Sequence, residues 1–158
     1  MRSTFHLLQI KPMIGTGNEF SFDPEQLDRE KILILAGQSM GNGKVDDISD
    51  VIYVKPETFD KTKTKDIAAE LEVFNKKMRK QDRYYILLGP GRWGTSDPFI
   101  GIPVKWSQIS NARIITETSL EDFPLDASLG SHFFHNVTSM NVGYFSIQHS
   151  FRDSMINW

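Results

Sequence analysis

The segment 89–96, Gly-Pro-Gly-Arg-Trp-Gly-Thr-Ser, holds the residue types best suited to bind an anion. Its three glycines allow backbone N–H groups to converge on one point, and its two hydroxyl groups can add further contacts. Arg92 supplies a planar guanidinium that can form two parallel hydrogen bonds with a phosphate or a carboxylate. The candidate anion-binding residues are therefore Gly89, Gly91, Arg92, Gly94, Thr95 and Ser96.

The same segment also fits a structural turn. In that interpretation Trp93 fills the core and Arg92 pairs with an acid such as Asp97. Glycine-rich turns after strands are common in α/β folds, so the sequence leaves both interpretations open. The apolar segment 98–106, with two prolines, either packs beneath this loop or forms a contact surface for another domain or subunit.

His132 and His135 are three residues apart and would share one face of a helix. Such a pair could bind a metal, act as a general base or accept a phosphoryl group. The simpler interpretation is a pair of locally hydrogen-bonded histidines beside the core residues Phe133 and Phe134. No carboxylate stands at a metal-ligand spacing beside them, so we predict no metal site.

Two other polar segments are poor matches to ligand-binding loops. The segment 37–44 lacks the spacing of a phosphate-binding loop, and Val45 follows Lys44 where a hydroxyl residue is needed. The acidic cluster of Asp46, Asp47 and Asp50 lacks the closing glutamate of a calcium loop. We expect a solvated turn in the first and a solvated loop that caps the next element in the second.

The elements around these residues predict a mixed fold. Apolar and β-branched runs predict strands near 32–36, 51–54, 84–88, 113–117 and 143–147. Helical spacing predicts one helix over 64–80 and a second through 133–137, capped by Ser128 or Ser131. The unbroken apolar run at 32–36 favours a sheet with helices on both faces, and 37–43 is expected to be a loop. The fold class is thus α/β or α+β, with one mixed sheet of about five strands and two main helices packed on it.

Length and composition exclude several classes of site and function. The 158 residues are the size of one domain, and the absence of cysteine excludes disulfides, thiolate metal sites and cysteine nucleophiles. A net charge of −2 gives no reason to expect a nucleic-acid partner. No apolar run approaches the roughly 20 residues of a spanning helix, so we expect no membrane segment and a cytoplasmic location.

Two stretches resemble a known family. The segment Phe-His-Leu-Leu-Gln-Ile-Lys-Pro at 5–12 resembles the last strand of the ATP-grasp domain of phosphoenolpyruvate synthase and pyruvate phosphate dikinase. That strand carries an apolar run followed by Gln-x-Arg-Pro. The segments 88–106 and 130–136 are similar to the carboxy-terminal region of bacterial proteins assigned to this family. On this resemblance the single domain 1–158 has a strand at 4–12 of ATP-grasp type, followed from about 19 to 158 by a carboxy-terminal α/β domain.

The resemblance implies a carboxy-terminal fragment of an ATP-dependent phosphotransferase that acts on pyruvate-like substrates. Gln9 and Lys11 match positions that contact the nucleotide, although Lys11 replaces an arginine and loses its planar fork. ATP and Mg²⁺ would bind the parent protein, and neither would bind tightly to this chain alone. The expected partners are the ATP-grasp domain and a small phosphate or carboxylate anion, with His132 and His135 as accessory residues.

The family also uses a phosphohistidine in a Gly-Gly-x-Thr-x-His context, which this sequence lacks. Phosphoryl transfer needs several cations and Mg²⁺ acting together, so we expect the chain to be inactive alone. The alternative is a non-catalytic docking or ligand-sensing domain attached to the kinase body.

Overall fold

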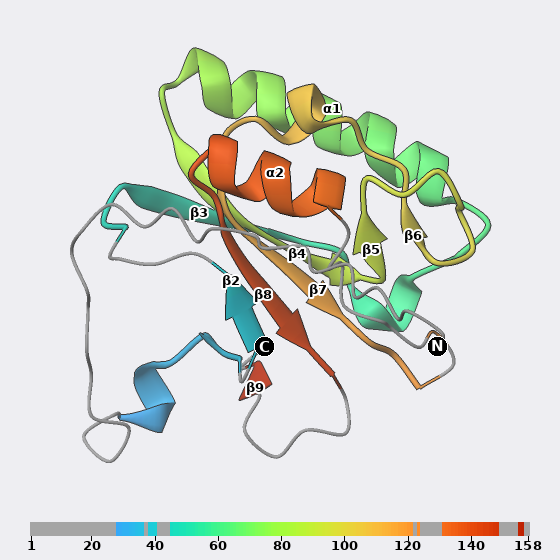
Figure 1. Cartoon of the computed structure of the whole chain (residues 1–158), viewed down its shortest axis with the longest axis horizontal. Helices are drawn as coiled ribbons and strands as arrows, with labels where there is room; N and C mark the ends of the chain where they lie inside the picture. Colours follow the sequence, from blue (N-terminus) through green and yellow to red (C-terminus); the bar gives the residue numbers. More distant parts are fainter. Residues whose placement is uncertain are drawn as a thin grey trace, which may run out of the picture.

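The structure is a computed structural model that describes residues 28–36, 38–40, 45–121, 123, 131–148 and 155–156. Its main element is a five-stranded sheet in the order β2-β8-β7-β4-β3 (Figure 1). The neighbours from β3 to β8 are parallel, and β2 is antiparallel to β8, which makes the sheet mixed. The strands are β2 (Gln38–Met40), β3 (Ile48–Tyr53), β4 (Tyr84–Pro90), β7 (Ala112–Thr118) and β8 (Gly143–Ile147).

Two helices pack on this sheet, α1 (Thr64–Lys80) and α2 (Ser131–Ser139), and the predicted fold class is confirmed. The remaining strands form two ribbons. One joins β1 (Ile34–Leu35) to β9 (Met155–Ile156), and the other joins β5 (Arg92–Trp93) to β6 (Gly101–Ile102). Short 3-10 helices complete the described elements: η2 (Arg29–Lys31), η3 (Pro56–Thr58) and η4 (Trp106–Ile109).

Helix α1 has the bounds that its sequence pattern predicts. Its buried residues recur at spacings of four, three, four and three, which places them on one stripe that faces the sheet. An acid stands in its first turn and three bases in its last turn, as the helix dipole favours. The buried stripe consists of Thr64, Ala68, Leu71, Asn75 and Met78.

Both helices lie on the same face of the sheet, so the prediction of helices on both faces is wrong (Figure 1). The parallel strands β3, β4, β7 and β8 follow one another in space in the same order as in the chain. Right-handed connections between strands that advance in one direction all cross the same face. The strand order therefore decides which face the helices cover, and the apolar run at 32–36 does not.

The amino-terminal part of the described chain differs most from the prediction. The run 32–36 forms only the two half-buried residues of β1, which pair with β9 outside the main sheet. The expected loop at 37–43 contains β2, which pairs with Phe145 and its neighbours on β8. Main-chain hydrogen bonds to an edge need no apolar side chains, so polar residues can form such a strand. The predicted strand 4–12 lies outside the described residues.

Strand β3 begins earlier than predicted and takes in part of the acidic cluster. Ile48 and Asp50 are strand residues, so the expected capping loop there is wrong. Asp50 pairs with Arg83 at 2.7 Å, and Asp47 pairs with Arg113 at 3.3 Å. Both carboxylates thus neutralise basic side chains at the start of neighbouring strands, and burial alternates along β3.

Candidate functional site

The predicted anion loop begins with Gly89 and Pro90, the last two residues of β4, and lies at the carboxyl end of the parallel strands. Four successive backbone amides, those of residues 91–94, donate to oxygen atoms of the protein itself. Gly91, Arg92 and Gly94 donate to the carbonyls of Thr118, Ile100 and Ile102, each at 2.9 Å, and Trp93 donates to the Glu117 carboxylate at 3.0 Å. These four amides are therefore not available to converge on an anion.

Close packing explains the glycines of this segment. Gly91 has a φ of +72°, and a Cβ atom there would overlap the Phe123 ring. A Cβ atom on Gly89 would meet the Trp93 ring, and one on Gly101 would overlap the backbone of Arg92. Glycine is required at these positions because another part of the chain comes within contact distance, which is its role in a tight turn.

Trp93 fills the core, as the structural interpretation predicts. Its side chain is 2% exposed, and its indole N–H donates to the Thr116 carbonyl at 3.0 Å. Asp97, the acid expected to pair with Arg92, instead accepts the Phe99 amide at 2.9 Å. Arg92 itself is half-buried and has other interactions within the chain. The assignment of Arg92, Thr95 and Ser96 as anion contacts stays a prediction that would depend on their side chains.

The segment 98–106 packs in the core over its second half and exposes its tip. Ile102 and Val104 are buried in the core, so the second half of the segment packs beneath the loop. Phe99 at its tip is 69% exposed. The tip is held by a turn in which the Thr95 hydroxyl oxygen accepts the Asp97 amide at 3.1 Å.

Glu117 on β7 is a buried carboxylate that the sequence pattern did not predict as a site residue. Its side chain is fully buried and accepts two hydrogen bonds, from the Trp93 amide and from the Tyr144 hydroxyl at 2.7 Å. Ser146, its register partner on β8, has a buried hydroxyl without a partner among the described residues, and so has Thr116. An acid inside the run Ile-Ile-Thr-Glu-Thr is a signal that could have identified this cluster, because charged residues are rarely buried unless paired.

A second buried polar cluster lies at the amino ends of β4 and β7. The Asn75 side-chain oxygen accepts the Tyr85 hydroxyl at 2.9 Å and the Asn111 amide at 3.0 Å, and its NH₂ group donates to the Ser110 hydroxyl at 3.1 Å. Burial raises the pKa of Tyr85 well above its usual range. This cluster ties α1 to the sheet and to the turn after η4.

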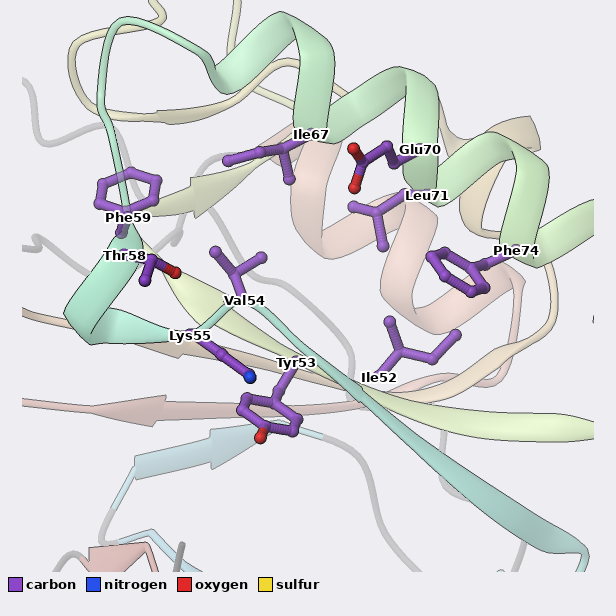
Figure 2. Close-up of a pocket in the computed structure, with 10 residues that line it drawn as sticks. All are labelled: Ile52, Tyr53, Val54, Lys55, Thr58, Phe59, Ile67, Glu70, Leu71 and Phe74. Atoms are coloured by element: carbon purple, nitrogen blue, oxygen red, sulfur yellow. The ribbon is translucent and has the colours of Figure 1, made fainter.

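A hollow of about 230 Å³ opens between β3, η3 and α1 (Figure 2). Its lining is mainly apolar, with one basic and one acidic residue. Figure 2 shows Ile52 on β3 and Val54, one residue past its end, facing Leu71 and Phe74 on α1. The full lining is Ile52, Tyr53, Val54, Lys55, Thr58, Phe59, Ile67, Glu70, Leu71 and Phe74.

Most of the other predicted site residues lie outside the part of the chain that the structure describes. Gln9 and Lys11 lie outside the described residues, as does the side chain of His132, and His135 on α2 is exposed. Among the residues that the structure describes, no group of three histidine, aspartate or glutamate side chains could hold a metal ion. None of the helices in that part of the chain has the length and apolarity needed to cross a membrane.

Comparisons of this chain with protein-family models, with curated proteins and with solved structures found no match.

Proposed function

We propose that this chain is a non-catalytic domain of an ATP-dependent phosphotransferase of the phosphoenolpyruvate synthase and pyruvate phosphate dikinase type. The resemblance of segments 88–106 and 130–136 is the reason to name that type. The observation that carries the non-catalytic role is the occupation of the amides of 91–94 by oxygens of the protein itself. A phosphate-binding loop needs such amides to face its ligand.

The strand order supports the same proposal. In open α/β sheets, ligands bind outside the carboxyl ends of the strands, at the point where the strand order reverses. The four parallel strands described here advance in one direction without a reversal. The two helices that connect these strands lie on one face of the sheet (Figure 1). No crevice therefore opens between connections on opposite faces.

The contacts of the buried Glu117 side chain also support the proposal. Its carboxylate accepts one hydrogen bond from the turn after β4 and one from β8, so it links three neighbouring segments of the chain. Because the side chain is fully buried, its described contacts are structural and not directed at a substrate. The role that remains for the domain is to dock on the catalytic body or to sense a ligand for it.

A second candidate function concerns Arg92. The residue is half-buried at the start of β5, and the hydroxyl residues Thr95 and Ser96 follow three and four positions later in the chain. In the assembled phosphotransferase this guanidinium would contact a phosphate or carboxylate through its side chain alone. The same proposal includes ATP and Mg²⁺ as ligands of the assembled phosphotransferase. Gln9 and Lys11 would contact the nucleotide there.

The test is a titration of the isotope-labelled chain with phosphoenolpyruvate, pyruvate and Mg-ATP, followed by amide NMR and by phosphorus NMR. We expect no phosphoryl transfer and no saturable shift of the 91–94 amides up to about 1 mM ligand. Saturable binding at those amides, or transfer of phosphate, would overturn the proposal.

The candidate function of Arg92 has its own measurement. Shifts confined to Arg92 Nε and to Thr95 and Ser96 that disappear in Arg92→Ala would support it. Arg79→Ala, an exposed arginine on α1, is the control and should leave such shifts in place. In the complete phosphotransferase Arg92→Ala should lower activity about tenfold, since a charge-assisted hydrogen bond contributes roughly 1.5 kcal/mol. Unchanged activity would contradict an anion contact at this position.

A further inference from the structure

We draw no further inference here: the strongest candidate, the mainly apolar hollow between β3, η3 and α1, carries none because nothing in the part of the chain that the structure describes shows what covers it.

Discussion

Two buried polar clusters lie at opposite ends of the same sheet and are built differently. At the amino ends of the strands, the neutral Asn75 side chain joins α1, β4 and the start of β7, and its oxygen and NH₂ group both have partners. At the carboxyl ends, Glu117 brings an ionisable group into the core. The neighbouring hydroxyls of Thr116 and Ser146 have no partner among the described residues.

The difference separates a neutral cluster that joins α1 to the sheet from an ionisable one that sets the path of the turn after β4. Every described contact of Asn75 joins regular elements or the turn after η4. Glu117 instead holds the Trp93 amide, so it sets the path of the segment that carries Arg92. A buried carboxylate is costly unless it is hydrogen-bonded, and its two described donors come from segments distant in sequence. The carboxyl end of the sheet thus depends on contacts that no local pattern specifies.

The largest expected effect is that of Glu117→Ala. The substitution leaves the Tyr144 hydroxyl and the Trp93 amide without this acceptor in the core, so the free energy of unfolding should fall by about 4 kcal/mol. Urea unfolding measures this loss. Glu117→Gln keeps the shape and should cost less, and Glu121→Ala, at an exposed acid, should change little. A loss below about 1 kcal/mol in Glu117→Ala would contradict the difference between the two clusters, because it would show that Glu117 does not stabilise the turn that contains Trp93.

Asn75→Ala should have the next largest effect. It removes the acceptor of the buried Tyr85 hydroxyl and of the Asn111 amide, so we expect a loss of about 3 kcal/mol in the free energy of unfolding. Asn75→Asp keeps the accepting oxygen but loses the NH₂ donor and buries an ionisable group, so it should also destabilise. Lys76→Ala, at the exposed neighbour, is the control for helix substitution. Equal stability of Asn75→Ala and the control would show that the cluster does not stabilise the fold.

Alkaline pH should weaken the Asn75 cluster. Burial raises the pKa of Tyr85 above the ordinary value of 10.0. The unfolded chain therefore releases this proton near pH 10 while the folded chain retains it, and stability falls as pH rises further. The expected slope is about 1.4 kcal/mol per pH unit. Unfolding measured across this range should show that slope in the wild type relative to Tyr85→Phe. Parallel curves for the two proteins would contradict a buried, neutral phenol.

The smallest effects are expected at the two hydroxyls near Glu117. Thr116→Val and Ser146→Ala remove buried groups without described partners, so the free energy of unfolding should change by less than about 1 kcal/mol or rise. Ser110→Ala is the matched contrast, since it removes a hydroxyl that accepts from Asn75. We expect it to destabilise by about 1 kcal/mol, measured by urea unfolding. A larger loss in Ser146→Ala than in Ser110→Ala would show that the Ser146 hydroxyl is partnered in the native protein.

Local patterns predicted the elements whose own residues carry a strong signal. The 64–80 helix was predictable because its apolar residues repeat at helical spacing, and the strand at 143–147 because its apolar and aromatic residues are bounded by turns. β2 was not predictable, because main-chain pairing with β8 forms it from polar residues. The pairing of β1 depends on residues near the other end of the chain.

The candidate anion loop shows the same limit. Its glycines and arginine were visible in the sequence, but the direction of its amides was not. Those amides face inward because Gly91 and Gly94 pair with carbonyls of β7 and β6, while Trp93 pairs with Glu117. The partners are between eight and 27 residues away in the chain, since Gly91 bonds Thr118 and Gly94 bonds Ile102.

The residue types of this chain by themselves determined a mixed domain with one sheet, a long amphipathic helix and a rigid apolar arm after the Arg92 turn. These features follow from periodicity, chain stiffness and composition, which act between near neighbours. The tertiary structure alone decided that both helices cover one face, that Glu117 is buried, and that residues of β3 and α1 line the same hollow. Hydrogen bonds and burial between distant segments fix these outcomes, and they arise only when the chain has folded on itself.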